Sequence, residues 1–558
     1  MYEQKFTSFL SRNKLENKPF QTECFKWCIS KEQAEQPRQA EQPQQADEPR
    51  QADEPEQRKG GILALEMGLG KTIIMIGLIK CNIKKRTLIV LPRSLLEQWE
   101  KNIINLCACK PLIYHGSHPK NMKMSLAEIQ AASQIVITTY GQVSMPSPSQ
   151  VNKGRRRSLL HDIEWDRLIC DEAHHVSHKK TNEFQGVKAL KVGICWLVTG
   201  TPIQNNENEL YSLYSLLGKP DGKTYYDTGE NYNAVARDLV FYSTKADVCI
   251  ALPPLNQHFI ALPWETESEQ EFSSHLHSML EFCHVPKKII AQQINDMEDK
   301  KTLHMRYMAK ALKVCCYPPM LKNTISHFDE MLRADKSNAY PNVVPAELYL
   351  SQNKVNQVVQ KLIDRKANGC GKIVFCHYYA EIDAYAECLR AADPNMRIAL
   401  FDGRVPASKR NNILQTPVDI LLAQIKMCRE GLNLQEHYSE VYLPSPHFNP
   451  AIEQQAIARC WRMGQKKPVD VFRWGVTPGG NPPHPPSVEN DGGNEEEYPS
   501  EGDEEGFPTE ATGGVGGATP QTMDMYATFL HSKKREFVER LAGNAVGYIN
   551  TVGYTKNL

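Results

Sequence analysis

The hydrophobic positions of this 558-residue chain fall into short apolar runs separated by longer amphipathic or polar stretches. An apolar run at 61–65 ends in a glycine-rich turn, and an apolar stretch with helical length follows at 71–80. Runs at 86–92, 135–140, 167–170 and 196–199 have the length and composition of buried strands, while 94–99 and 209–217 have a helical pattern. Strands that alternate with helices predict a parallel sheet with its functional groups at the carboxyl ends of the strands.

A second series of apolar runs begins after a polar, helical stretch that extends from about residue 260 to 340. These runs lie at 372–376, 397–401, 419–423 and 440–443. They predict a second parallel sheet, so the expected fold class is α/β with two parallel-sheet lobes and a helical spacer.

Two stretches lack the apolar residues that a core needs. Residues 35–57 repeat a hexamer with proline at every sixth position, from Pro37 to Pro55, and residues 476–520 are rich in proline, glycine and acidic residues. Both are expected to be disordered. Residues 33–57 carry a net charge of −5 and residues 476–520 carry −10, so the remainder of this neutral chain carries +15. A positive folded part suits a protein that handles a polyanion, and an uneven solvated surface is the alternative.

The sequence lacks the marks of secreted, membrane and zinc proteins. Its N-terminus has no apolar stretch typical of a signal peptide, and no run of 18 apolar residues occurs. The 16 cysteines are scattered without a C-x-x-C pair. We interpret them as reduced structural thiols of a soluble intracellular protein.

Candidate chemistry begins at residues 60–72, GGILALEMGLGKT, where the first apolar run meets the first helix. Backbone N–H groups of the turn at Gly68 and Gly70, with the helix N-terminus, form an anion site. Lys71 can reach nucleotide phosphates, and the Thr72 hydroxyl can hold Mg²⁺. Leu65 stands where the full phosphate-loop pattern has glycine. Taken alone, this turn is also compatible with an ordinary strand-to-helix connection.

A pair of carboxylates further along the chain supports a nucleotide site. Asp171 and Glu172 directly follow the apolar run at 167–170. Such an aspartate can hold the Mg²⁺ of a bound nucleotide, and the adjacent glutamate can orient or deprotonate the attacking water. Gln21, upstream of the phosphate loop, can read adenine through the donor and acceptor of its amide. The two motifs together predict a nucleoside triphosphatase.

Arg459 and Arg462 are candidate catalytic groups in the second lobe. They are three residues apart and are predicted to share one helix face. Paired surface arginines commonly form salt bridges. In a chain whose first lobe binds a nucleotide, arginines from a second sheet can also stabilise γ-phosphate charge in the transition state.

With these residues in place, the chain resembles the SNF2 family of superfamily 2 ATPases from about residue 18 to 542, outside the two disordered stretches. The motifs that carry the resemblance, in family order, are KPFQ, GGILALEMGLGKT, LIVLPRSLLEQW, DEAHH, LVTGTPIQNN, IVFC, GLNL, FNP and QQAIARCWRMGQ. The resemblance implies two RecA-like lobes. The predicted segments are an N-terminal helical segment with the adenine-reading glutamine (1–34), the hexapeptide repeat (35–57), lobe 1 (58–235), the helical spacer (236–340), lobe 2 (341–475), the acidic insertion (476–520) and a C-terminal closing helix and tail (521–558).

The resemblance also implies a role for each candidate residue. For the cofactor, it assigns adenine to Gln21, phosphate to Gly68, Gly70, Lys71 and Thr72, and Mg²⁺ to Thr72 and Asp171. For catalysis, it assigns the attacking water to Glu172 and completion of the site to Gln455, Arg459 and Arg462. For coupling between the lobes, it points to Thr199, Thr201 and Gly431.

Members of this family hydrolyse ATP to translocate along double-stranded DNA and remodel what is bound to it. The resemblance therefore implies an ATP hydrolase that uses ATP and Mg²⁺, with duplex DNA and DNA-bound proteins as partners. We expect a monomeric core without a membrane association, located in the nucleus or, for a viral protein, at the site of DNA replication or transcription. A core without RING-like, bromodomain-like or chromodomain-like segments is also similar to the compact SNF2-like proteins of large DNA viruses.

Several positions depart from the family pattern. They are Leu65 for an aspartate, Tyr242 and Ser243 for an arginine pair, Gln424 for a serine, Cys428 and Arg429 for a glycine pair, and Phe448 for a tryptophan. The phosphate loop, the acidic pair and the arginines remain, so hydrolysis is expected, whereas coupling to DNA through residues 424–431 is in question. Two alternatives stay open: a strand-separating helicase on DNA or RNA, and an ATP-gated scaffold that binds DNA with little turnover.

Overall fold

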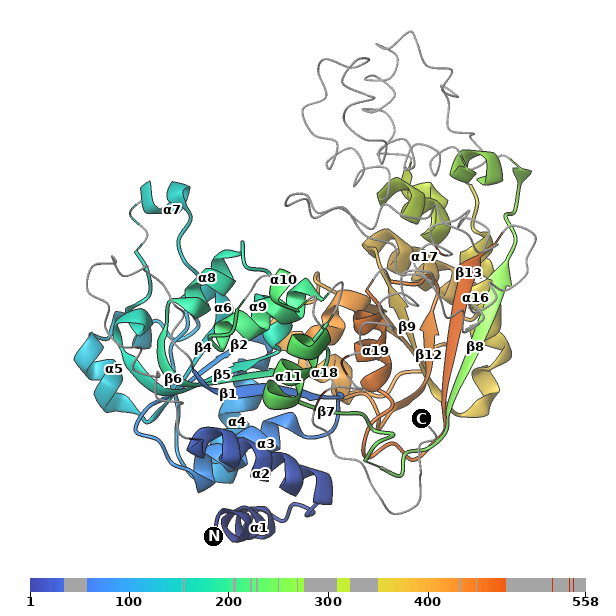
Figure 1. Cartoon of the computed structure of the whole chain (residues 1–558). Coiled ribbons are helices and arrows are strands. Elements are labelled where there is room, and N and C mark those ends of the chain that lie inside the picture. Colours follow the sequence, from blue (N-terminus) through green and yellow to red (C-terminus); the bar gives the residue numbers. More distant parts are fainter. Residues whose placement is uncertain are drawn as a thin grey trace, which may run out of the picture. The chain divides into compact units, whose positions relative to one another are not determined.

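The computed structural model describes residues 1–34, 58–152, 156–203, 207–220, 223–226, 229–248, 250–267, 269–274, 309–321, 350–430, 433–447 and 449–477, together with Gly154, Asp524, Leu541 and Ala545. The predicted disordered stretches, apart from residues 476 and 477, lie outside the described residues, as do Gly431, Phe448 and most of 521–558. The chain forms two compact units (Figure 1). Residues up to Leu252 form most of the first unit, which also includes Leu541, and the second unit begins at Pro253.

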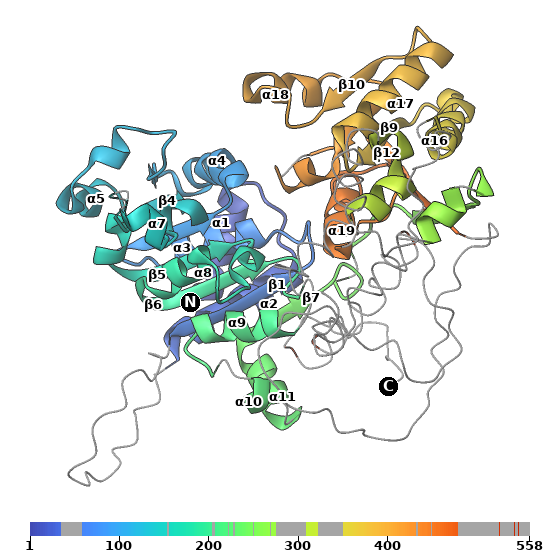
Figure 2. The ribbon, with the colours of Figure 1, turned by 90° about the horizontal axis from the view of Figure 1, so that it is seen from above.

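A seven-stranded parallel sheet forms the centre of the first unit, in the order β3-β4-β2-β5-β6-β1-β7. Its strands are β1 (Lys59–Leu65), β2 (Thr87–Leu91), β3 (Leu112–Ile113), β4 (Ile135–Thr139), β5 (Glu164–Asp171), β6 (Lys191–Thr199) and β7 (Val240–Ser243). Its helices are α1 (Tyr2–Arg12), α2 (Pro19–Gln33), α3 (Lys71–Cys81), α4 (Leu96–Cys107), α5 (Leu126–Ala132), α6 (Tyr140–Val143), α7 (Pro148–Asn152), α8 (Asn182–Lys188), α9 (Asn208–Leu216), α10 (Lys223–Tyr226) and α11 (Gly229–Leu239). Figure 2 shows β5, β6 and β1 side by side in this sheet.

Helices cover both faces of the first sheet, which explains its continuous apolar strands. Successive residues of β1 alternate between two cores: Ile62 and Ala64 belong to one, and Leu63 and Leu65 to the other. The second core also contains the buried faces of α1–α4, and the first contains those of α8, α9 and α11. Figure 1 shows α1, α2 and α3 on one side of the strands and α8 and α9 on the other. Leu541, far along the chain, is fully buried in the core under α8, α9 and α11.

The second unit contains a six-stranded parallel sheet in the order β10-β11-β9-β12-β13-β8. Its strands are β8 (Leu255–Leu262), β9 (Gly371–Cys376), β10 (Ile398–Phe401), β11 (Ile420–Gln424), β12 (Tyr438–Leu443) and β13 (Val469–Val476). Its helices include α16 (Asn353–Asp364), α17 (Tyr379–Ala392), α18 (Ala407–Gln415) and α19 (Pro450–Ala458). Helices α16 and α17 cover one face of this sheet, and α19 covers the other face.

Two strands correct the predicted domain boundaries. Both β7 and β8 fall within 236–340, where we expected only a helical spacer. β7 belongs to the first sheet because Val240 and Phe241 pair in parallel with Ile62 and Leu63 of β1. β8 is an edge strand whose middle residues are exposed, so its sequence lacks the apolar run that marks a buried strand. The first unit therefore extends beyond residue 235.

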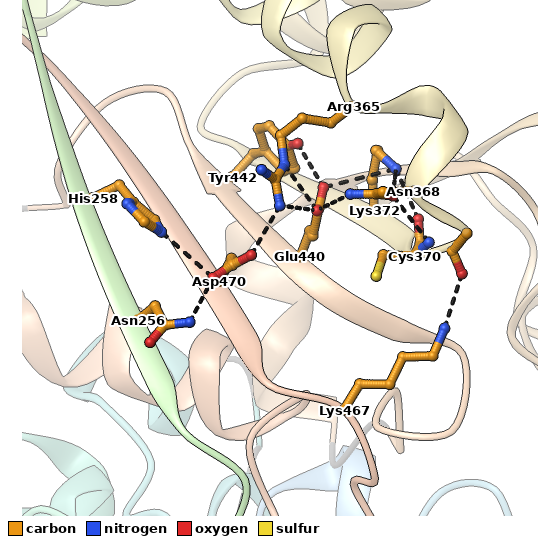
Figure 3. A network of polar contacts seen from close by, with 11 residues as sticks. Asn256, His258, Arg365, Asn368, Cys370, Lys372, Glu440, Tyr442, Lys467 and Asp470 are labelled. Atoms are coloured by element: carbon orange, nitrogen blue, oxygen red, sulfur yellow. Dashed lines mark hydrogen bonds and ion pairs between the residues drawn. The ribbon is translucent and has the colours of Figure 1, made fainter.

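A polar network crosses the second sheet near the amino ends of its strands (Figure 3). The strand registers place Lys372 beside Glu440 and Glu440 beside Asp470. Arg365 donates to both acids, at 2.5 and 2.8 Å, and the Tyr442 hydroxyl donates to Glu440 at 2.8 Å. Burial lowers the pKa of Lys372, and the charge of Glu440 acts in the opposite direction, to raise it. Because parallel strands carry their ligand sites at the carboxyl ends, this network serves to hold the sheet together.

A buried ion pair attaches the N-terminal helices to the first sheet. Arg167 donates from Nε and Nη2 to Glu32 at 2.7 and 2.6 Å, and both side chains are fully buried. The same carboxylate accepts a bond from Trp196 Nε1 at 2.9 Å and from Asn82 Nδ2 at 2.6 Å. Arg167 lies in β5 and Trp196 in β6, so one carboxylate of α2 is bound to both strands.

Changing Glu32 to Gln is expected to destabilise the first unit by about 3–5 kcal/mol, because Arg167 would stay buried without its counter-charge. The measurement is thermal and urea unfolding of the full chain, followed by tryptophan fluorescence. The matched control is Glu23→Gln on the same helix, where the carboxylate pairs with Lys26 in solvent. The control should melt like the parent protein. Parental melting of the Glu32 variant would contradict a central role for the pair.

Candidate nucleotide site

The turn between β1 and α3 has the backbone conformation that the sequence predicts for a phosphate loop. Gly68 and Gly70 have φ angles of 92° and 83°, and Gly70 is the N-cap of α3. A Cβ on Gly70 would lie 2.4 Å from Nε2 of Gln21. Glycine is therefore needed here both for its positive φ and for space. The turn presents the N-terminus of an 11-residue helix, which is a suitable site for an anion.

Lys71 extends over the carboxyl ends of β1 and β6. Its Nζ donates to the carbonyl of Leu65 at 2.8 Å, and a Cβ on Gly200 would lie 3.2 Å from the same nitrogen. Thr72 follows as the second residue of α3 and is partly exposed. The ammonium group and the hydroxyl are thus both at the turn, as the sequence predicts.

Gln21 lies against the same turn. Its side chain is buried, and Nε2 donates to the carbonyl of Leu69 at 3.0 Å. The residue comes from α2, whose first helical residue is Pro19. The structure therefore places Gln21 at the phosphate loop, while its role in reading adenine stays a prediction.

Asp171 ends β5 and is almost fully buried. Its Oδ2 accepts a bond from Trp99 Nε1 at 2.7 Å, and its Oδ1 accepts one from the Glu172 backbone at 3.0 Å. Burial and the charge of Glu172 raise the pKa of Asp171 to about 6, while the bond from Trp99 and the charge of Lys71 lower it. Because the charge of Lys71 acts on the Asp171 carboxyl, the phosphate loop and the acidic pair belong to one electrostatic site.

Glu172 has an unusual backbone for a residue with a side chain. Its φ and ψ are 51° and 52°, in the left-handed region. Strained conformations of this kind cluster at functional sites. The Glu172 Oε2 atom lies 3.4 Å from Nδ1 of His174, and the side chain is mostly buried. The turn after β5 therefore presents two carboxylates in different surroundings.

Thr199 ends β6 beside these groups. It is fully buried, and its Oγ1 accepts a bond from the Thr201 backbone at 3.1 Å. In the sheet, Thr199 pairs with Ala64 of β1, and Val198 pairs with Asp171 of β5. The register thus places the end of β6 next to the ends of the two strands that carry the phosphate loop and the acidic pair.

A family model of the SNF2-related domain matches residues 20–320, and one of the helicase conserved C-terminal domain matches residues 353–464. The first match alone covers more than half of the chain. The chain belongs to the SNF2-related family. The expected membership is confirmed, and with it the expected class of enzyme, an ATPase of the helicase superfamily. The expected two-lobe α/β fold agrees with the two parallel sheets.

Relatives of this SNF2-family chain have different lengths. The DNA excision repair protein ERCC-6-like of Danio rerio is 25% identical over 489 residues, which cover 75% of this chain and 33% of that protein. The probable global transactivator of Orgyia pseudotsugata multicapsid polyhedrosis virus is 27% identical over 433 residues, which cover 74% of this chain and 81% of that protein. A solved structure, the Sulfolobus solfataricus SWI2/SNF2 ATPase core in complex with dsDNA, is 18% identical with a TM-score of 0.36, covering 82% of this chain and 87% of that one. The chain thus spans a third of the first relative and most of the viral one.

In the second unit, the structure corrects the prediction that Arg459 and Arg462 share a helix face. Helix α19 ends at Ala458, and the backbone turns away after it, with Gly464 at a φ of 97°. Gln465 Nε2 donates to the carbonyl of Cys460 at 3.1 Å, which satisfies the backbone after the helix end. Both arginines lie in this turn.

Arg462 contacts another family motif of the second unit. Its Nη1 donates to Oδ1 of Asn433, in the GLNL motif, at 2.8 Å, and the Arg459 carbonyl accepts a bond from Leu434 N at 3.2 Å. Burial and the charge of Arg459 lower the pKa of Arg462. Gln455 is buried on α19. The structure therefore brings together two motifs that the sequence separates by almost thirty residues.

Sequence reasoning missed three residues that contact the acidic pair or the phosphate loop. Trp99 binds Asp171, the Tyr140 hydroxyl donates to the Asp171 carbonyl at 2.7 Å, and Lys245 forms an ion pair with Glu66 at 3.1 Å. Trp99 lies within the LLEQW part of a motif that we quoted, but an apolar pattern does not distinguish it from an ordinary core tryptophan. The contacts could be found only in three dimensions.

No three His, Cys, Asp or Glu side chains gather into a metal-binding group anywhere in the described ranges. Within the same ranges, no helix is long and apolar enough to cross a membrane. The cysteines whose side chains the structure describes are free thiols.

Changing Gly70 to Ala is expected to weaken nucleotide binding, because the new Cβ would displace Gln21 while the left-handed backbone costs about 1–2 kcal/mol. Gly154→Ala is the matched control: its φ is 80°, with nothing within 4 Å of an added Cβ. Calorimetric titration with ADP measures the affinity of both variants. We expect the control to bind like the parent protein, and equal affinities for all three proteins would refute the placement of the site.

Proposed function

We propose that this chain is an ATP-dependent double-stranded DNA translocase that hydrolyses ATP to remodel or displace DNA-bound proteins. The observation that carries the proposal is the gathering of Lys71, Asp171, Glu172 and Thr199 at adjacent strand ends of the first sheet, in a chain of the SNF2-related family. A phosphate-binding turn and an acidic pair at one sheet edge are the parts that phosphoryl transfer to water requires.

The donor set suits ATP with Mg²⁺. Mg²⁺ prefers oxygen ligands and is commonly held by one or two carboxylates with substrate phosphates, so it needs no larger cluster of protein ligands. We assign this role to the buried Asp171 carboxylate and the Thr72 hydroxyl. The ion would neutralise charge that develops on the phosphate oxygens.

Each remaining site residue has a role in this proposal. Gln21 orients the base, Lys71 binds the phosphates, and Glu172 orients or deprotonates the attacking water. Thr199 and Thr201 couple nucleotide state to the second unit. Gln455, Arg459 and Arg462 of the second unit, with Gly431, complete the active state when duplex DNA is bound.

Duplex DNA is the proposed track, and DNA-bound proteins are the proposed targets. The positive charge of the chain outside its two acidic stretches supports a polyanionic partner. We propose that the chain acts as a compact, monomeric core. We place the protein in the nucleus or, if the chain is viral, at the site of viral DNA replication or transcription.

The decisive experiment measures ATP turnover with and without duplex DNA, beside displacement of a triplex-forming strand. Stimulated turnover with triplex displacement is the expected result. Separation of a forked duplex without triplex displacement would instead support a strand-separating helicase. DNA binding without turnover would support an ATP-gated scaffold and overturn the proposal.

Changing Glu172 to Gln should remove the base while keeping the shape, so ATP should bind with near-parental affinity and persist. Single-turnover kinetics and nucleotide titration separate the two effects. The companion variant Lys71→Ala removes a phosphate contact and should lower affinity as well as turnover. Weak nucleotide binding by the Glu172 variant would show that this residue maintains the turn rather than activating water.

Changing Arg462 to Ala should reduce DNA-stimulated turnover by about 10³, the typical worth of a transition-state arginine, and basal turnover much less. ATP affinity should hardly change, because the ground-state nucleotide contacts belong to the first unit. Arg397→Ala is the control, since that arginine pairs with Asp419 at an exposed position of the same unit. An equal proportional loss with and without DNA would identify Arg462 as a structural residue.

A further inference from the structure

Two aromatic side chains that the proposed function does not use donate hydrogen bonds to Asp171. Trp99 Nε1 bonds to Oδ2 of the carboxylate at 2.7 Å, and the Tyr140 hydroxyl bonds to the backbone carbonyl at 2.7 Å. All three residues are at most 5% exposed. These contacts are buried and short, so they restrict both the side chain and the backbone of Asp171.

The two donors come from different elements on the same side of β5. Trp99 lies on α4, which follows β2, and Tyr140 is the first residue of α6, which follows β4 directly. In the sheet, β2 pairs with β5 on one side and with β4 on the other. The segments that follow β2 and β4 therefore both reach the turn after β5.

Each donor controls a different part of the turn. Trp99 binds one carboxylate oxygen while the Glu172 backbone binds the other, so the plane of the carboxylate is determined by two bonds. Tyr140 holds the carbonyl that directly precedes Glu172, whose backbone is left-handed. A left-handed residue of this kind persists only where its surroundings determine the conformation.

We propose that Trp99 and Tyr140 are positioning residues. Trp99 orients the Asp171 carboxylate toward the nucleotide-bound cation. Tyr140 holds the backbone segment that sets the direction of the Glu172 side chain. This inference rests on the proposed function, because it assumes that Asp171 receives the cation. Partners that orient a metal ligand typically change metal affinity or activity 10- to 100-fold when they are removed. A hydrogen bond to an ionised acceptor is also stronger than one between neutral groups.

The first unit contains a matched control for each residue. Trp165 is also buried, and its Nε1 donates to the neutral carbonyl of Leu160 at 2.9 Å. The Tyr226 hydroxyl, on a fully buried residue, donates to the carbonyl of Pro220 at 2.6 Å. Trp→Phe and Tyr→Phe changes at these positions remove the same donors without touching the acidic turn.

The experiment for Trp99 compares the affinity for ADP in Mg²⁺ with the affinity for ADP in EDTA, by calorimetry on the full chain. We expect Trp99→Phe to reduce the gain from Mg²⁺ about tenfold or more and to leave the metal-free affinity unchanged. Trp165→Phe should keep the parental gain. An unchanged gain in the Trp99 variant would overturn the inference, whereas no gain in the parent protein would overturn the proposed nucleotide site itself.

A second variant addresses the packing lost with the indole ring. Benzothienylalanine at position 99 replaces the N–H group with sulfur and keeps the size and shape of tryptophan. If the hydrogen bond positions Asp171, this variant should show the same reduced gain from Mg²⁺ with parental melting. A parental gain would show that Trp99 acts only by packing and would overturn the inference.

The Tyr140 experiment separates turnover from binding. Tyr140→Phe should lower kcat about tenfold with little change in KM or in the gain from Mg²⁺, because the carboxylate of Asp171 keeps its bond from Trp99. Tyr226→Phe should retain parental kcat. Parental kcat in the Tyr140 variant, or an equal loss in both variants, would remove the assigned role of Tyr140.

Discussion

The buried ion pair between Glu32 and Arg167 is the interaction on which the candidate site depends most. It binds α2, which carries Gln21, to β5, which ends in Asp171. The bond from Trp196 to the same carboxylate adds β6, which ends in Thr199. Removing either charge would leave the other buried without a partner, at a cost of several kcal/mol. A single acid therefore connects the helix and the two strands whose ends supply the base-reading, metal-binding and coupling candidates.

Parallel sheets explain why polar networks at opposite strand ends have different roles. In the first unit, apolar strands end in Leu65, Asp171 and Thr199, and the turn after Leu65 leads to the N-terminus of α3, which favours anions. In the second unit, Glu440 and Asp470 lie near the amino ends of β12 and β13 and are bound by Arg365 and Tyr442. The carboxylates there are saturated by protein donors. Those of the first unit lie at the strand ends where parallel sheets bind ligands.

The sequence predicted features that local chemistry determines, and it failed where distant residues decide. Gly70 and Lys71 were predictable because a left-handed turn before an apolar helix has its own pattern. The bond from Trp99 to Asp171 joins residues 72 apart, and the pair of Glu32 and Arg167 joins residues 135 apart. The spacing of apolar residues along the sequence does not indicate which distant residues will be such partners. The arginine turn was mispredicted because α19 ends at Ala458, and the backbone after it is held by a bond from the side chain of Gln465 to the Cys460 carbonyl. Strands β7 and β8 were missed because one is short and the other is exposed.

The electrostatics of Asp171 favour binding of a cation. Burial raises its pKa to about 6, with the charge of Glu172 acting in the same direction and Lys71 opposing it. A buried anion beside a second carboxylate gains stabilisation from a nearby positive ion, which also favours the ionised form. The bond from Trp99 contributes in the same way as such an ion, by stabilising the ionised carboxylate, but it also sets the direction of the free lone pairs. Trp99 thus contributes both to the charge state and to the orientation of Asp171, whereas Lys71 acts on this carboxyl through its charge.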